Sequence, residues 1–183
     1  NLDKVLFPND GITKGDVINY YIRVAPFLLP FIADRPMSMH PFPDGIDAQR
    51  HFWQKDIPEY APEWLKTFRY PALEDKKMLR WGLINDLPSL VWVANHASLE
   101  LHPWSSRYDQ PRHPDWAIFD FDPSEPAGFE EVRELARLVK VALDQLRLRS
   151  YVKTTGQRGL QIYVPIVREH TYDVCLLYTS PSP

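Results

Sequence analysis

The sequence predicts one domain of mixed α and β structure, and two observations support this fold class. Apolar segments typical of strands alternate with amphipathic segments typical of helices, most clearly in the second half of the chain. Hydrophobic residues make up 44% of the 183 residues and aromatic residues 13%, which is enough for a hydrophobic core. We find no internal repeat and no long linker, so we expect a single domain or an incomplete part of a larger one.

In the first half of the chain, helix-start signals and short apolar runs predict the helices and strands. Thr13 and Asp16 have the spacing of a helix start, and apolar residues then recur at helical spacing as far as Leu28. Pro26 and Pro30 fall within this pattern, so a kink or an early break is expected. Beyond it, the sequence predicts strands at 37–42 and 51–55, a short buried helix at 87–97 and an extended segment at 99–102.

The second half has a clearer pattern of strand, helix and strand pair. Apolar residues predict a strand at 116–121, and an amphipathic pattern predicts a helix at 129–146. Two further strands, at 150–155 and 160–166, are joined by a turn that contains two glycines. Ligands commonly bind at the strand ends of such units.

The C-terminal residues differ from the rest of the chain. Thr171 is predicted to cap a short helix. Residues 175–183 have no helical face and end in alternating Ser and Pro, which resembles translated read-through of a sequencing adapter. We therefore expect 175–183 to be non-native or disordered, and 1–174 to form a partial domain.

Charge, cysteine content and hydropathy exclude several classes of protein. The formal net charge is −3, so binding to a polyanion would depend on local basic pockets. Cys175 is the one cysteine, which excludes an internal disulfide and a multi-cysteine metal site and fits a reducing cytoplasm. The chain contains no apolar run of about 18 residues, and we expect neither a membrane span nor a signal peptide.

The sharpest candidate site is the pair Asp120 and Asp122 at the end of a predicted strand. Side chains two residues apart on a strand point the same way, so both carboxylates share one face while Phe119 and Phe121 face the core. Adjacent carboxylates repel each other unless a cation lies between them, and hard oxygen ligands suit Mg²⁺ or Mn²⁺. The pair indicates either a metal site for phosphoryl transfer or an acidic turn at a strand end.

A second candidate is the glycine-containing turn, where Thr155, Gly156 and Arg158 lie between Lys153 and Gly159. Hydroxyl groups, backbone N–H groups and a guanidinium can all donate to phosphate oxygens. An ordinary hairpin turn would use glycine as well. Because one crossover helix separates this turn from the two aspartates, a metal site and a phosphate site would lie on neighbouring strands, as nucleotide transfer requires.

The first half supplies cations and aromatic residues. Lys4 and Lys14 flank a turn, and such lysines either bind phosphate as point charges or are ordinary solvated surface charges. Phe52 and Trp53 could stack on bases, although neighbours on a strand face opposite ways, so one of them is expected in the core. His102 has no assignment from spacing alone.

Five motifs in order along the chain together resemble the polymerase domain of bacterial DNA ligase D, within the archaeo-eukaryotic primase superfamily. They are DKVLFP at 3–8, FPDGI at 42–46, FWQK at 52–55, FDFDP at 119–123 and KTTG at 153–156. The resemblance extends from Asn1 to about Asp173. It implies a primase-polymerase fold, with a central mixed or antiparallel sheet flanked by helices and a truncated C-terminus.

The resemblance also implies roles for single residues. Asp120 and Asp122 match the family's catalytic, metal-binding aspartates, which usually bind Mn²⁺, with Mg²⁺ as the alternative. The positions implied for the incoming nucleotide are His102, Thr155, Gly156, Arg158 and Gln161; for the DNA 5′-phosphate, Asn1, Lys4 and Lys14; and for stacking on the template, Phe52 and Trp53.

The implied activity is that of a DNA-end-directed nucleotidyltransferase, a DNA-dependent DNA/RNA polymerase of bacterial non-homologous end joining. It would add ribonucleotides or deoxynucleotides to a primer 3′-OH with a divalent metal. Its partners would be DNA ends with a 5′-phosphate, nucleoside triphosphates, the Ku homodimer and a ligase module. The expected location is the bacterial cytoplasm, in association with the nucleoid.

Three positions depart from the family pattern. Gln161 replaces a histidine and cannot carry positive charge toward the triphosphate, so weaker nucleotide binding is expected. Pro41 stands where relatives often carry arginine, so one phosphate contact is expected to be absent. The family's third metal-binding aspartate lies downstream of this chain, and we expect lower metal affinity and exposed apolar surface as a result.

Two other functions stay open on the sequence. The chain could be a non-catalytic module that binds 5′-phosphorylated DNA ends, for which Lys4, Lys14 and Trp53 would suffice. It could instead be a glycosyltransferase that uses a metal and a sugar nucleotide. Only the Asp-x-Asp pair suggests that reading, and it does not account for the N-terminal lysines.

Overall fold

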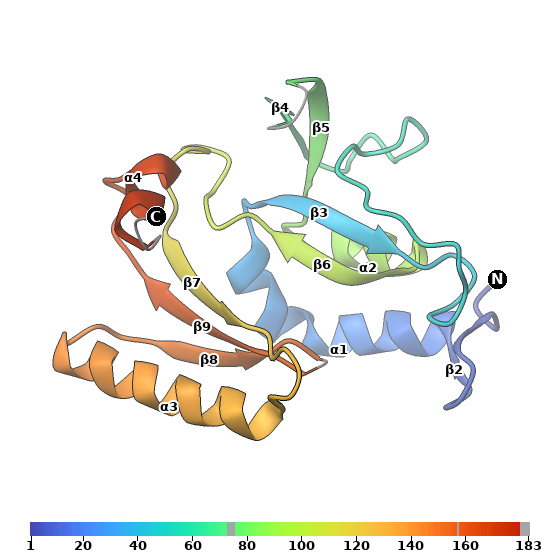
Figure 1. Ribbon diagram of the computed structural model, residues 1–183. Coiled ribbons are helices and arrows are strands. Elements are labelled where there is room, and N and C mark those ends of the chain that lie inside the picture. Colours follow the sequence, from blue (N-terminus) through green and yellow to red (C-terminus); the bar gives the residue numbers. More distant parts are fainter. Residues whose placement is uncertain (73–75, 157, 180–183) are drawn as a thin grey trace. The chain divides into compact units, whose positions relative to one another are not determined.

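The computed structural model describes residues 1–72, 76–156 and 158–179, with their side chains as far as Cys175 (Figure 1). The chain forms two compact units, an N-terminal unit (Asn1–Asp109) and a C-terminal unit (Gln110–Pro183), and each is described by itself. Two compact units can belong to one domain, so the expected single domain stays a prediction.

A four-stranded antiparallel sheet forms the centre of the N-terminal unit (Figure 1). Its strands in spatial order are β4 (Thr67–Pro71), β5 (Met78–Leu83), β3 (Pro36–Pro41) and β6 (Ser98–Pro103). The ladder between β3 and β6 runs from Met37 opposite Pro103 to Pro41 opposite Ser98. This ladder fixes which side chains of the two strands are neighbours.

The helices α1 (Lys14–Ile32) and α2 (Leu87–Asn95) build the core of the N-terminal unit with this sheet. Met37 and Met39 of β3 are fully buried in that core, since residues two apart on a strand share a face. Side chains on the opposite face of β3 and β6 are therefore directed away from the helices. Before α1, a short antiparallel ladder joins β1 (Val5–Phe7) and β2 (Ile12–Thr13).

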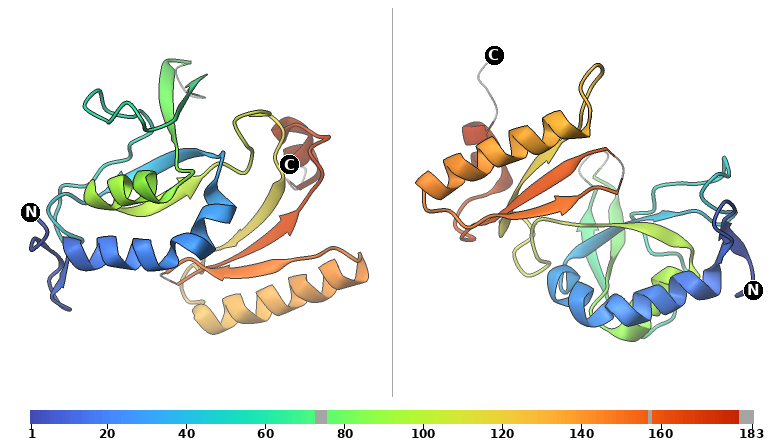
Figure 2. Two further views of the ribbon diagram at one scale, coloured as in Figure 1. Left: turned by 180° about the vertical axis from the view of Figure 1, so that it is seen from behind. Right: turned by 90° about the horizontal axis from the view of Figure 1, so that it is seen from below.

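The start of α1 is the helix start that the sequence predicts. Thr13 is the N-cap: its Oγ1 accepts a hydrogen bond from the Asp16 N–H (3.2 Å), and the Thr13 N–H donates to Asp16 Oδ2 (2.9 Å). The helix continues past Pro26 and Pro30 to Ile32, so it has no early break. Its last turns run at an angle to its first turns in Figure 2, so the expected kink is present.

The C-terminal unit contains a three-stranded antiparallel sheet in the order β7 (Trp116–Phe121), β9 (Leu160–Pro165) and β8 (Tyr151–Thr154). The helix α3 (Phe129–Gln145) packs on one face of this sheet. The core between them contains Val132, Ala136, Leu143, Leu160, Ile162 and Val164, with Phe119 and Phe121 partly buried against it.

Several elements differ from the sequence predictions, among them the short strands β1 and β2, which were not predicted. No strand forms at 51–55, where Gln54 makes one isolated bridge with Met39. The strands β4 and β5 were not predicted, because alternation with arginines such as Arg69 and Arg80 weakens their apolar signal. The helix α4 (Tyr172–Thr179) includes residues 175–179, where no helical face was predicted. Residues 180–183 lie outside the described residues, and the non-native origin of the tail stays a prediction.

Taken together, these elements form the mixed α and β structure that the sequence predicts, with antiparallel pairing in all three sheets of the described residues. Within the described residues, no helix has both the length and the hydropathy that a membrane crossing requires.

Candidate functional site

Asp120 lies near the end of β7 and Asp122 follows its last residue, Phe121; we call these two aspartates the acidic pair. Both side chains are exposed, while Phe119 and Phe121 alternate with them and pack toward α3. Among the described residues, no donor forms a hydrogen bond with either carboxylate, and no cluster of three or more His, Cys, Asp or Glu side chains could hold a metal. The pair supplies oxygen ligands that suit Mg²⁺ or Mn²⁺, but only two of them.

The hairpin turn between β8 and β9, residues 155–159, lies directly against this acidic pair. A Cβ on Gly159 would lie 2.4 Å from Asp122 Oδ1 and 2.8 Å from the Phe121 carbonyl oxygen, so a side chain cannot fit there. Thr155 closes the turn: its Oγ1 accepts from the Gly159 N–H (3.1 Å), and its own N–H donates to the Gly159 carbonyl (3.1 Å). The predicted adjacency of the aspartates and the turn is confirmed.

The remaining turn residues predicted to grip a triphosphate have different surroundings. Gly156 has a φ of +95°, in the region that favours glycine, and a Cβ there would meet no atom within 4 Å. The Arg158 side chain is exposed. Gln157 lies outside the described residues. The turn therefore has an exposed guanidinium at Arg158 and an open backbone at Gly156, while the Thr155 hydroxyl and N–H are bonded to Gly159 within the turn. The roles of these groups in binding stay predictions.

A row of polar side chains crosses the sheet beside the turn. Asp120 pairs with Gln161 across β7 and β9, and Gln161 pairs with Lys153 across β9 and β8. Gln161 Oε1 accepts hydrogen bonds from Lys153 Nζ (3.2 Å) and from the Tyr163 hydroxyl (3.1 Å). Lys153 belongs to the KTTG motif at 153–156 that the sequence analysis identified. Its place in the same row as Asp120 follows only from the register of β7, β9 and β8.

In the N-terminal unit, His102 is part of a network that the sequence did not reveal. The Glu100 carboxylate oxygen Oε2 lies 3.1 Å from His40 Nδ1 and 3.2 Å from His102 Nε2. His40 Nε2 in turn lies 2.9 Å from His51 Nδ1. Burial alone would raise the pKa of Glu100, but the hydrogen bonds from His40 and His102 outweigh it and lower that pKa.

Trp53 packs against the same network. Its indole stacks on the His40 ring, with centroids 4.5 Å apart and planes at 18°, and meets His102 edge to face at 4.6 Å. We call His40, His51, Trp53, Glu100 and His102 the histidine cluster.

The expectation that either Phe52 or Trp53 is buried in the core is wrong. Both are exposed, at 44% and 56%. They belong to a loop instead of a strand, so the alternation of faces that the prediction assumed does not apply.

The two lysines predicted to bind a 5′-phosphate are held near each other through the backbone, because the Lys14 N–H donates to the Lys4 carbonyl (2.8 Å). Lys4 Nζ donates to Asp44 Oδ1 (2.8 Å), and Lys14 Nζ donates to the Asn95 carbonyl at the end of α2 (2.9 Å). Asn1 Oδ1 accepts from the Asp3 N–H (3.1 Å).

Asp44 is the anion beside Lys4, and sequence reasoning did not assign it a role. The hydrogen bond from Lys4 is the largest of the effects that lower the pKa of Asp44. Arg50 Nη1 also lies 3.6 Å from Asp44 Oδ2. Arg50 thus adds a guanidinium beside the carboxylate that Lys4 contacts. The contact between Arg50 and Asp44 could not be predicted from the sequence, because a separation of six residues in a loop implies no fixed geometry.

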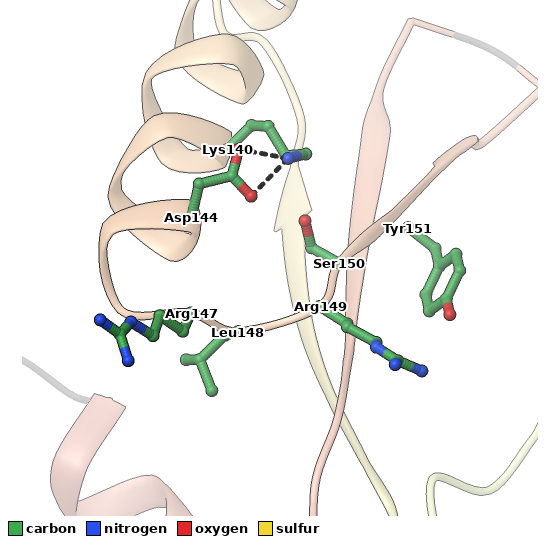
Figure 3. A pocket seen from close by; sticks show the side chains of 7 residues that line it. All are labelled: Lys140, Asp144, Arg147, Leu148, Arg149, Ser150 and Tyr151. Carbon is green, nitrogen blue, oxygen red and sulfur yellow. Dashed lines mark hydrogen bonds and ion pairs between the residues drawn. The ribbon is translucent and has the colours of Figure 1, made fainter.

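A hollow of about 400 Å³ lies at the connection between α3 and β8 (Figure 3). An ion pair between Lys140 and Asp144 lies on its α3 side. Arg147 and Arg149 point in different directions in Figure 3 and do not converge on a common point. This hollow contains none of the predicted site residues.

The chain matches the family model of the LigD primase-polymerase domain over residues 13–179. It is 36% identical over 168 residues to the multifunctional non-homologous end joining protein LigD of Mycolicibacterium smegmatis. It is 32% identical over 182 residues to the bifunctional non-homologous end joining protein LigD of Bacillus subtilis. These matches cover 91% and 98% of this chain but 22% and 28% of the two relatives, so the chain spans about a quarter of their length.

A solved structure gives the same result. The polymerase domain of ligase D from Mycobacterium tuberculosis, in complex with DNA, matches with a TM-score of 0.85 and 31% identity, over 93% of this chain and 61% of that one. The match confirms the predicted fold. With the family match across both units, it shows that this chain belongs to the LigD primase-polymerase domain family.

Proposed function

We propose that this chain provides the nucleotide-transfer part of a DNA-dependent DNA/RNA polymerase that acts at DNA ends in bacterial non-homologous end joining. The observation that carries the proposal is the contact between the acidic pair and the glycine turn. A Cβ on Gly159 would come within 2.4 Å of Asp122 Oδ1, so the turn and the aspartate are in close contact. Metal ligands and phosphate donors are thereby adjacent on one sheet, as phosphoryl transfer requires.

In the C-terminal unit, Asp120 and Asp122 would hold the divalent metal, Mn²⁺ or Mg²⁺, through their carboxylate oxygens. Such a metal would offset the charge that develops on the triphosphate during transfer. Thr155, Gly156 and Arg158 would donate hydrogen bonds to the triphosphate oxygens. Gln161 would contribute an uncharged contact, with Lys153 Nζ 3.2 Å from its side-chain oxygen.

In the N-terminal unit, His102 would contact the incoming nucleotide, and Phe52 and Trp53 would stack on template bases. The exposure of both aromatic side chains supports a stacking role, because a base needs access to the ring face.

Asn1, Lys4 and Lys14 would bind the 5′-phosphate of the DNA end. The two lysines lie beside each other along the backbone, and this supports a shared phosphate contact. Arg50, 3.6 Å from Asp44, is a further cation that could approach the same phosphate.

The proposed partners are DNA ends with a 5′-phosphate, nucleoside triphosphates, the Ku homodimer and a ligase module, in the bacterial cytoplasm at the nucleoid. The Mycobacterium tuberculosis neighbour was solved in complex with DNA, which supports the DNA partner. The relatives are named multifunctional and bifunctional end-joining proteins, which supports a link to further modules.

A second candidate is a non-catalytic module that binds 5′-phosphorylated DNA ends. Three cations of the N-terminal unit favour it, because Lys4, Lys14 and Arg50 do not depend on the acidic pair. Both candidate functions include DNA binding, but only the first includes nucleotide transfer.

A paired assay separates the two candidates. Gapped DNA with and without a 5′-phosphate is tested for gel-shift binding, and for primer extension with Mn²⁺ and each class of nucleotide. Extension by this chain rejects the purely binding function. Binding that depends on the 5′-phosphate without extension supports the binding module, and the absence of both contradicts both candidates.

A further inference from the structure

We infer that Glu100 is a positioning residue, which orients His102 directly and Trp53 through His40. It would thereby couple the group proposed to contact the nucleotide to the group proposed to stack on the template. The functional part of this inference rests on the proposed function. The positional part depends only on contacts within the N-terminal unit.

The first step is the strand register. His40 of β3 lies directly opposite Glu100 of β6, and His102 is two residues further along β6. All three side chains therefore share the face of the sheet that is opposite to Met39 and the helices. His40 is 8% exposed and His102 is largely exposed, so Glu100 connects an interior ring to a surface ring.

The second step is the hydrogen bonding of a single oxygen. Glu100 Oε2 is the acceptor for both His40 Nδ1 (3.1 Å) and His102 Nε2 (3.2 Å). An ionised carboxylate only accepts, so it selects the Nδ1–H form of His40 and the Nε2–H form of His102. In the neutral His40 ring, Nε2 then accepts from the Nδ1–H of His51 at 2.9 Å. His102 Nδ1 is left as the acceptor of its ring.

The third step joins Trp53 to this arrangement. Its indole lies nearly parallel to the His40 ring and edge-on to the His102 ring. The strength of such ring contacts depends on the relative orientation of the rings. Since Glu100 fixes both imidazoles, it also sets the surface on which Trp53 rests. Loss of the carboxylate would let His102 and Trp53 turn independently.

If Glu100 only joined β3 to β6, its substitution would have other effects than those expected for a positioning residue. The ladder between these strands already holds them with backbone hydrogen bonds over five residue pairs. A structural role predicts lower thermal stability without a change of histidine tautomer. A positioning role predicts that the substitution changes the tautomer of His40 and has a small effect on thermal stability.

The test uses the chain labelled with ¹⁵N-histidine and the variant Glu100→Ala, with Glu63→Gln as the matched control. Glu63 is an exposed carboxylate of the same unit. Long-range ¹H–¹⁵N spectra at alkaline pH report which ring nitrogen carries the proton, and single histidine substitutions assign the signals. We expect the Nδ1–H form of His40 in the unaltered chain and in Glu63→Gln, and a shift toward the Nε2–H form in Glu100→Ala. Unchanged tautomers in Glu100→Ala would overturn the inference.

A binding arm tests the functional half. Fluorescence anisotropy measures the affinity of a labelled primer–template, with and without a nucleoside triphosphate, for the same proteins. We expect Glu100→Ala to bind the primer–template in the presence of the nucleoside triphosphate about tenfold more weakly than the unaltered chain does. Glu100→Gln keeps one acceptor oxygen, so its affinity should lie between those of the unaltered chain and Glu100→Ala. If Glu100→Ala does not fold, Glu100→Gln replaces it in both arms.

The two possible failures are distinguishable. If the unaltered chain binds neither DNA nor nucleotide, the proposed function fails and the tautomers alone decide whether Glu100 positions the rings. If the unaltered chain binds both and Glu100→Ala binds them equally well, the coupling is rejected while the proposed function stands.

Discussion

The two units build their candidate sites in opposite ways. The histidine cluster of the N-terminal unit consists of side chains that hold one another, with Glu100 accepting two hydrogen bonds and Trp53 contacting two rings. In the C-terminal unit, the acidic pair stands exposed at a strand end, and the described residues offer its carboxylates no donor. In that unit the close packing involves the backbone, because Gly159 lies against the Phe121 carbonyl and Asp122.

This difference shows two ways of preparing a polar site. Side chains that read a flat base or a ring need a fixed orientation, which neighbouring side chains provide. Carboxylates that hold a cation need open oxygens, and both aspartates of the acidic pair are exposed. Substitutions in the histidine cluster should therefore change orientation, whereas substitutions in the acidic pair should remove charge.

The largest effect is expected from removal of the acidic charge. Asp120→Asn and Asp122→Asn should each reduce Mn²⁺-dependent primer extension by about 100-fold or more, because each loses a negative oxygen ligand while keeping its shape. Extension assays and calorimetric Mn²⁺ titration measure the loss. Glu134→Gln, on an exposed position of α3, is the control and should retain activity. Full activity in both Asn variants would contradict the metal site.

The next effect tests whether the turn depends on its backbone fit. Gly159→Ala should lower the free energy of unfolding by about 2 kcal/mol, because the new Cβ would overlap the Phe121 carbonyl and Asp122. Gly156→Ala is the matched variant: it has space for a Cβ but a φ of +95°, so about 1 kcal/mol is expected. Urea denaturation of both variants gives the order, and a larger loss for Gly156→Ala would refute the argument from close packing.

A smaller effect should follow from restoring a charge beside the acidic pair. Gln161→His should strengthen binding of a nucleoside triphosphate by about threefold at pH 6, and by less at pH 8, because only the protonated ring adds positive charge. Isothermal titration with a non-hydrolysable triphosphate measures the change. Gln145→His, at the exposed end of α3, makes the same substitution away from the turn and should have no effect. Equal gains at both pH values would argue against a charge effect.

The smallest effect concerns the cations of the N-terminal unit. Asp44→Asn should raise the affinity for 5′-phosphorylated DNA about twofold, since it frees Lys4 and Arg50 from an anion that is exposed and screened by salt. Gel shifts at low salt, with and without the 5′-phosphate, isolate the contribution of that phosphate. Asp47→Asn removes the same charge from a neighbouring exposed position. If it raises the affinity equally, net charge alone explains the gain.

Local signals in the sequence predicted the parts of the structure that depend on local physics. The capping of α1 by Thr13 and Asp16, the periodicity of α3 and the alternation along β7 all act within a few residues. For that reason the position of Asp120 at the end of a strand and the turn between two later strands could be derived from the order of the residues alone. The family resemblance supplied the roles of His102 and the lysines, which spacing did not.

The features that the sequence missed depend on distant residues. His40 meets Glu100 across 60 positions, and only the register of β3 with β6 brings them together. The segment at 51–55 has the composition of a strand, but apart from the single bridge between Gln54 and Met39 it pairs with no described strand, and Phe52 and Trp53 both remain exposed. Pairing is a property of two segments, so one segment cannot reveal it.

The stack of Trp53 on His40 limits how a nucleic acid could use this indole. One ring face is already covered at 4.5 Å, and 56% of the residue is exposed. A base could therefore lie only on the opposite face, so Trp53 would end a column of bases and could not be sandwiched within one.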